Sequence, residues 1–238
     1  MASGAGPKPV SDGLIFEFDA ANGRSYAGTG LTANSLIPGL KGSLLNGVGF
    51  STSNSGTFIF DGSNDYVDVD DFNFDFSKGL TICSFCYPTN ASNWARIIDF
   101  GLGQQNDNII LSRLTATNNF FLEVRSGTAA SQSLVSSSGN QFVVNSFHFL
   151  SGVVDGGTPG SGTSARLYYN GSLISSTPTG SIIVPNTINR TSNYIARSNW
   201  TADSYYTGYI YSILIYNRAL SDAEIRQNYN ATKGRYGL

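Results

Sequence analysis

Aromatic residues that could stack on a sugar ring lie in polar segments of this chain. Its only two tryptophans, Trp94 and Trp200, each follow an asparagine, and Tyr205 and Tyr206 come shortly after the second. Sugar recognition combines exposed aromatic faces with amides and hydroxyls that give directional hydrogen bonds. We therefore expect a carbohydrate-binding site formed by Trp94, Asn199, Trp200, Tyr205 and Tyr206. The alternative is that these rings close an end of the fold or lie in a contact between subunits.

Aspartates that could hold a metal ion gather in a turn-rich segment; they are Asp61, Asp65, Asp68, Asp70 and Asp71. Ca²⁺ takes such oxygen ligands together with backbone carbonyls. The spacing is not that of an EF-hand loop, and aspartates also stabilise turns by bonding nearby backbone N–H groups. We expect one structural calcium ion near Asp61, Asp65 or Asp68, with turn formation and a solvated acidic edge as the alternative.

Catalysis by a nucleophile and a histidine has one candidate base, because His148 is the only histidine. It lies between Phe147 and Phe149 on an expected core strand. A general base of this kind must face a cleft. A histidine between two core aromatics is instead expected to be packed and hydrogen-bonded, so we assign His148 a structural role.

The cysteines form a C-x-x-C pattern at Cys83 and Cys86, which could indicate metal or redox chemistry. They lie in a segment that reads as a strand, where residues i and i+3 point to opposite faces. The two thiols should therefore not meet, and we expect two buried free cysteines. This fits folding in a reducing cytoplasm.

The elements that must position these residues are short strands. We expect them at residues 14–19, 58–60, 66–69, 80–88, 96–101, 108–111, 120–124, 142–144, 147–154, 166–174, 193–197 and 208–216, with residues 27–55 mostly irregular. One helix should begin after Ser221, which forms a capping box with Glu224, and run to about residue 229. The pattern predicts an all-β, antiparallel two-sheet β-sandwich with one short C-terminal helix, formed by a single domain over 13–238 after an N-terminal arm at 1–12.

The composition limits the classes of partner that the protein could bind. Charged residues make up 13% of the chain and the net charge is −2, so a nucleic-acid partner has no electrostatic footprint. We see neither a secretory signal nor an apolar run of the ~20 residues that span a membrane. Low charge leaves little repulsion between copies, which favours a homo-oligomer.

Residues 208–225 read GYIYSILIYNRALSDAEI, and residues 60–67 read FDGSNDYV. Both segments are similar to motifs of the laminin-G-like, concanavalin A-like lectin domains, as are 80–88 and the LYYNG of 167–171. The resemblance covers roughly residues 12–230. It implies a concanavalin-like jelly roll, and members of this family often hold one structural Ca²⁺.

The two ends resemble sandwich domains of phage and other virus structural proteins, through DGL and DA-N--SY in residues 12–26 and the final GRYGL of 234–238. The resemblance implies a virion structural protein, a capsid decoration or a tail or fibre subunit, made in the host cytoplasm without a signal peptide. Its sandwich would bind host-surface glycans. Its partners would be other capsid or tail proteins, with the arm as anchor and, by family analogy, a trimer. The alternative is a free-standing carbohydrate-binding module or adhesin outside a virion.

The same architecture also hosts glycosidases, which need two carboxyl groups at a fixed separation. Residues 17–22, EFDAAN, resemble the E-x-D-x-x-E strand of one such family, but Asn22 replaces its second glutamate. The other glutamates are Glu123 and Glu224, and Glu224 is already used as a helix cap. We therefore expect a protein that is not an enzyme.

Overall fold

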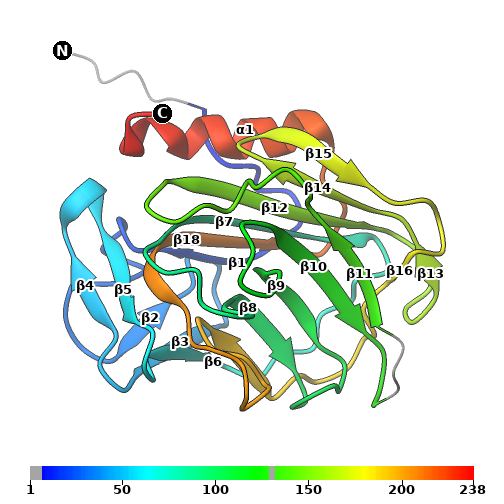
Figure 1. Cartoon of the computed structure of the whole chain (residues 1–238), viewed down its shortest axis with the longest axis horizontal. Helices are drawn as coiled ribbons and strands as arrows, with labels where there is room; N and C mark the ends of the chain where they lie inside the picture. Colours follow the sequence, from blue (N-terminus) through cyan, green and yellow to red (C-terminus); the bar gives the residue numbers. More distant parts are fainter. Residues whose placement is uncertain (1–6, 129–131) are drawn as a thin grey trace.

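Two antiparallel sheets stack face to face in the computed structural model, which describes residues 7–128 and 132–238 (Figure 1). The first sheet has the order β15-β14-β12-β7-β18-β5-β4, with β1 also paired to β18. These strands are β1 (Leu14–Asp19), β4 (Gly49–Ser51), β5 (Thr57–Asp61), β7 (Gly79–Pro88), β12 (His148–Asp155), β14 (Ala165–Tyr169), β15 (Ser172–Ser176) and β18 (Thr207–Tyr216).

The second sheet has the order β11-β10-β9-β8-β17-β6-β3-β2, and a small ribbon pairs β13 with β16. Its strands are β2 (Thr32–Asn34), β3 (Lys41–Leu45), β6 (Tyr66–Val69), β8 (Arg96–Gly101), β9 (Ile109–Arg113), β10 (Phe120–Arg125), β11 (Gln132–Ser136) and β17 (Ser192–Ile195). The ribbon strands are β13 (Gly162–Thr163) and β16 (Ile182–Ile183). The expected antiparallel sandwich is confirmed.

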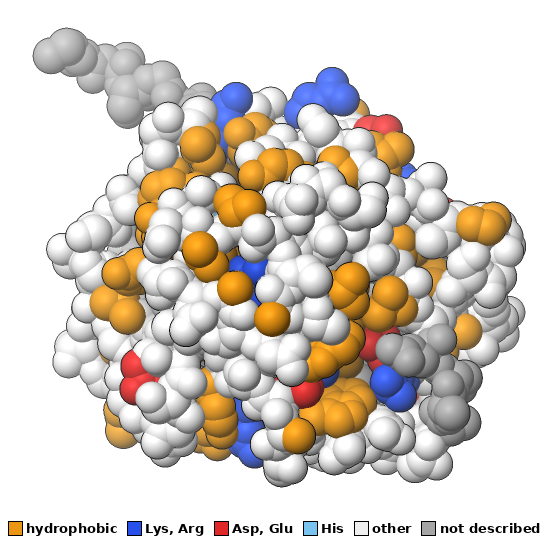
Figure 2. All heavy atoms as spheres, viewed as in Figure 1, with side chains coloured by type: hydrophobic (Ala, Val, Ile, Leu, Met, Phe, Trp, Pro, Cys, Tyr) orange, Lys and Arg blue, Asp and Glu red, His pale blue; other side chains and the backbone are white. Residues whose placement is uncertain are grey.

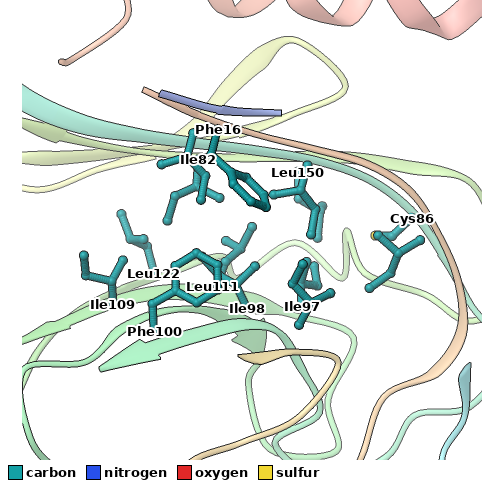
Figure 3. Close-up of a cluster of buried hydrophobic side chains, with 14 of the residues drawn as sticks. Phe16, Ile82, Cys86, Ile97, Ile98, Phe100, Ile109, Leu111, Leu122 and Leu150 are labelled. Atoms are coloured by element: carbon teal, nitrogen blue, oxygen red, sulfur yellow. The ribbon is translucent and has the colours of Figure 1, made fainter. Parts of the chain in front are cut away.

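The core fills the space between the sheets. Phe16 and Ile82 of the first sheet face Phe100 and Leu111 of the second, and all four side chains are buried (Figure 3). Alternate residues of β7 and β18 therefore point into this core, while the residues between them point outward and are also buried. Both faces of the first sheet are covered at its centre, as the apolar run at 208–216 predicted.

The outer face of the first sheet is covered by α1 (Asp222–Thr232) and by the 3₁₀ turn η2 (Lys233–Tyr236) (Figure 1). The expected capping box is present, because Ser221 Oγ accepts the Glu224 N–H while Glu224 accepts the Ser221 N–H at 2.9 Å. Ile225 is fully buried against the sheet. The helix is the one α-helix of the described residues and ends three residues later than expected.

The described part of the expected arm, residues 7–12, has neither helix nor strand but packs on the domain. The Val10 N–H donates to Asn228 Oδ1 at 2.8 Å, and the Tyr216 hydroxyl donates to the Val10 carbonyl at 3.0 Å. Asp12 pairs with Arg218 at 2.9 Å. These bonds attach the segment to α1 and β18, while residues 1–6 lie outside the described residues.

Two sequence expectations about strands are wrong. Residues 142–144 form no strand, because Phe142 instead packs on the Arg113 guanidinium, 4.4 Å from its ring. Residues 27–55, expected to be irregular, contain β2, β3 and β4. These strands are short, and they are held by pairing with other strands rather than by a local apolar pattern: β2 pairs with β3, β3 with β6, and β4 with β5.

The surface carries few charges. The face shown in Figure 2 is mostly backbone and uncharged polar side chains, with acidic and basic groups scattered singly. No helix in the described part of the chain has the length and apolarity needed to cross a membrane.

Both cysteines are free and buried, and they point to opposite sides of the first sheet as expected: Cys86 lies in the core and Cys83 lies under α1. Burial raises the pKa of each thiol to about 12. Because the thiolate is the reactive form, native protein at pH 8 should not react with an aromatic disulfide reagent. Unfolded, non-reduced protein should show both thiols; fewer would contradict the strand geometry.

Candidate carbohydrate-binding site

The two tryptophans of the expected site come together around one guanidinium. Arg96 of β8 lies 5.9 Å from the Trp94 ring centroid and 5.4 Å from that of Trp200. Trp94 has a φ of 56°, a strained conformation for a bulky residue, and its ring meets Phe121 edge-on at 5.6 Å. Trp94 and Trp200 thus lie around the same guanidinium on the outer face of the second sheet, and their part in a sugar site stays a prediction.

Trp200 covers buried ion pairs rather than standing free. Beneath this ring, Arg96 pairs with Asp203 at 2.7 Å. A second guanidinium, that of Arg125, lies 5.0 Å from the centroid of the Trp200 ring. Arg125 in turn pairs with Glu123 at 2.5 Å. Part of the Trp200 ring is therefore used within the protein, since it shields these charges from water.

The side chains of Asn199 and Tyr206 also make contacts within the fold. The Asn199 side-chain amide donates to Asp99 Oδ1 at 2.9 Å and to the Ser192 carbonyl at 3.1 Å, so its donors hold the loop. Tyr206 is 1% exposed and packs on Phe60. The assignment of Tyr206 to a sugar site is therefore wrong: residues 205 and 206 point to opposite sides, and only Tyr205 is partly exposed.

The residues of the expected calcium site do not converge. Asp61 Oδ1 accepts the Ser63 N–H at 2.7 Å, and the buried Asp65 accepts the Asp61 N–H at 3.2 Å. Asp68 lies on β6, and the charges that act on its pKa are those of Arg197 and two further aspartates. Among the described residues no three acidic, histidine or cysteine side chains are arranged to hold a metal ion. Asp61 and Asp65 thus bond to the backbone of their own turn, and the calcium ion stays a prediction.

The groups considered for catalysis are held in structural contacts. His148 is buried, its Nε2 lies 2.7 Å from the Val143 carbonyl, and burial lowers its pKa to about 4. Burial, followed by the charge of Asp19, raises the pKa of Glu17. Both Asp19 carboxylate oxygens, however, accept from Arg235 at 2.8 Å. One free carboxyl group is left where glycoside hydrolysis needs two.

A larger groove, which the sequence did not reveal, lies on the outer face of the first sheet. It has a volume of about 570 Å³, within the range of roughly 300–1,000 Å³ typical of small-ligand sites. Four adjacent rings form its floor, with centroid distances of 5.0 Å for Tyr87–Phe147, 5.8 Å for Tyr87–Tyr209, 6.5 Å for Tyr209–Tyr211 and 5.5 Å for Phe147–Tyr211. We call it the tyrosine groove.

The rim of the tyrosine groove is uncharged and, apart from Ile59, polar. Its other lining residues are Ser51, Ser53, Asn54, Thr57, Ile59, Thr89 and Asn145. Tyr87, Phe147 and Tyr209 are partly exposed, whereas Tyr211 is buried at the base. Tyr209 and Tyr211 alternate in an apolar run that predicts a covered strand, because nothing local shows where α1 stops covering the sheet.

This arrangement defines a class of protein: a lectin-like β-sandwich with an open aromatic groove on one sheet. A family profile described as the concanavalin A-like lectin/glucanases superfamily, Laminin_G_3, matches residues 61–226, and the chain belongs to this family. No curated protein matches the chain.

Several solved structures share the fold. Domain 4 of AbnA, a GH43 extracellular arabinanase from Geobacillus stearothermophilus, in complex with arabinotriose, has a TM-score of 0.68 at 15% identity over 91% of this chain and 98% of that domain. The binding domain of botulinum neurotoxin DC in complex with rat synaptotagmin II has a TM-score of 0.69 at 14% identity, covering 92% of this chain and 52% of that one. The chain thus spans about half of this neurotoxin domain.

Replacing Trp200 tests its position over the ion pairs. Trp200→Ala should lower the free energy of unfolding by about 1–3 kcal/mol, because it removes a large side chain and two cation–π contacts. Urea denaturation measures this loss. Thr201→Ala, an exposed neighbour, is the matched control and should leave stability unchanged. A Trp200→Ala protein as stable as the wild type would show that the ring stands free.

Proposed function

We propose that this protein is a non-catalytic domain that binds an uncharged glycan chain in the tyrosine groove. The observation that carries the proposal is the joined floor of four aromatic rings beneath a rim of hydroxyls and amides. Pyranose and furanose rings present apolar faces that stack on aromatic side chains, while their hydroxyls hydrogen-bond to such a rim. An open groove suits a chain that continues beyond both ends of the bound segment.

The residues of the described chain that line the groove carry no charge, which indicates the ligand class. An ionised sugar bound there would lose water without gaining a counter-charge, which is costly. A neutral oligosaccharide loses no charge hydration. The likeness to the arabinanase domain, which was solved with the neutral sugar arabinotriose, supports this choice.

A role in binding rather than hydrolysis is supported by the carboxyl groups. Asp19 is paired with Arg235, Asn22 stands where the related glycosidases carry glutamate, and His148 is bonded inside the fold. None of these residues lines the tyrosine groove.

We further propose that the domain is carried on a virus particle as a homo-oligomer, by family analogy a trimer, and is made in the host cytoplasm. The proposal is supported by the resemblance of both chain ends to virus structural proteins. The residues that carry this resemblance pack together: Arg218 bonds to Asp12, and Arg235 bonds to Asp19. Calcium has no part in either proposal.

Groove variants test the binding proposal. Tyr209→Ala and Tyr87→Ala should each weaken binding of a neutral oligosaccharide about ten-fold or more, as expected for an aromatic anchor. Calorimetry with arabinotriose and then an array of neutral oligosaccharides provides the measurement. Tyr205→Ala, a partly exposed tyrosine outside the groove, is the matched control.

The control also separates the two candidate sites. If Tyr205→Ala and Trp200→Ala abolish neutral-sugar binding and the groove variants do not, the site expected from the sequence is the correct one. If wild-type protein binds no sugar on the array, the proposed function is wrong.

Truncation tests the attachment to particles. A protein lacking residues 1–12 should no longer co-purify with intact virus particles but should keep its β-sheet circular dichroism spectrum. It should also melt at a lower temperature, because the Val10 contacts with α1 and β18 are lost. A chain lacking residues 1–6 keeps those contacts and is the control for stability. Full occupancy of particles by the shorter chain would rule out this anchor.

A further inference from the structure

We propose a second binding site, at Arg197 on the outer face of the second sheet, that takes a carboxylate-bearing sugar such as a uronic acid. It shares no lining residue with the tyrosine groove and stands independently of the function proposed there. Three features carry the proposal: the stacking of Arg197, its unused hydrogen-bond donors, and the small aromatic pocket beside it.

The Arg197 guanidinium packs against two tyrosines. Its central carbon lies 4.6 Å from the Tyr66 ring centroid and 4.3 Å from that of Tyr194, and these two rings meet edge-to-face at 5.5 Å. Tyr66 lies on β6 and Tyr194 on the neighbouring β17. The two strands thus fix the plane of the guanidinium without using its N–H groups.

Those N–H groups have no partner within the described part of the protein. Arg197 forms no hydrogen bond or ion pair there, unlike Arg96, Arg125, Arg166, Arg218 and Arg235, which all pair with carboxylates. The side chain is partly exposed. A pre-oriented guanidinium with free edges matches a carboxylate, which it binds through two parallel hydrogen bonds.

A small pocket of about 90 Å³ adjoins Arg197 and has room for the charged edge of one sugar unit. Its other lining residues are Ser198, Trp200, Thr201, Asp203 and Tyr205. Trp200 and Tyr205 are both partly exposed and offer surfaces for the sugar ring, and Thr201 offers a hydroxyl at the rim. The tryptophan and tyrosine expected from the sequence to contact sugar thus gain a role here, next to a cation.

The neighbouring carboxylates do not neutralise this cation. Asp203 is already paired with Arg96 at 2.7 Å and accepts the Ser198 hydroxyl at 2.8 Å. Burial raises the pKa of Asp68, and Arg197 acts on it only through its charge, without an ion pair. The charges of Asp71 and Asp70 also raise the pKa of Asp68. Arg197 is therefore the cation available to an incoming anion.

Wild-type protein provides the first test. We expect glucuronic acid to shift the NMR signal of the Arg197 Nε–H group, whereas glucose, which has the same ring without the carboxylate, leaves it unshifted. Sodium sulfate at equal ionic strength controls for a simple salt effect. Equal shifts from glucuronic acid and glucose would overturn the proposal, and so would an equal response to sulfate alone.

Variants provide the second test. Arg197→Gln should weaken glucuronic acid binding about ten-fold or more, since it removes a charge-assisted bidentate contact. Arg197→Lys, which keeps the charge but loses the planar fork, should give a smaller loss. Arg226→Gln removes an exposed arginine from α1 and is the matched control, expected to bind as the wild type does.

Neutral-oligosaccharide binding separates this proposal from the proposed function. It should be unchanged in Arg197→Gln, because the tyrosine groove is intact. If Arg197→Gln binds glucuronic acid as tightly as Arg226→Gln does, the proposal is wrong even when the groove binds neutral sugar. If Arg197→Gln does not fold, the comparison of glucuronic acid with glucose on wild-type protein decides alone.

Discussion

The two central strands of the first sheet, β7 and β18, must be covered on both faces, and the rest of the structure depends on this constraint. Their inward residues meet the second sheet, and their outward residues are equally apolar. The hydrophobic effect therefore requires a further layer, which α1 and η2 supply. The capping box at Ser221 begins that helix, and the burial of Ile225 packs it on the outward face.

The tyrosine groove follows from where this cover ends. Tyr236 of η2 stacks on Phe147 at 5.3 Å and lies 4.8 Å from Tyr211, so the last turn of the chain borders the groove. Beyond it the same aromatic face continues without a helix above it. Tyrosine suits this boundary, because its ring packs on the sheet while its hydroxyl reaches water.

Several charges of the chain are used inside it. Arg190 and Arg113 are buried, bond to backbone carbonyls and lie against phenylalanine rings, and burial lowers the pKa of Arg190 to about 10. Arg96 and Arg125 lie beneath Trp200. Ionic contacts thus brace the second sheet, and the lining of the tyrosine groove is made of uncharged side chains that suit neutral sugars. Arg197, stacked but unpaired among the described residues, departs from this pattern.

The sequence by itself determined the local features of the fold, which depend only on residues that are neighbours along the chain. The strand period separated Cys83 from Cys86, the pair Asn170-Gly171 formed its tight turn with positive φ at both residues, and Ser221 with Glu224 began the helix. Each follows from local geometry that no distant contact needs to supply.

Only the tertiary structure decided which aromatic rings face solvent and which charges are free. Tyr205 and Tyr206 are adjacent and alike in the sequence, yet one is partly exposed and the other is buried, because the loop crosses the end of the core between them. The groove joins rings from β7, β18 and the loop before β12, segments about 60 residues apart or more. Packing between such distant segments decides which rings are exposed and which charges are paired. A pattern of neighbouring residues along the chain cannot predict this packing.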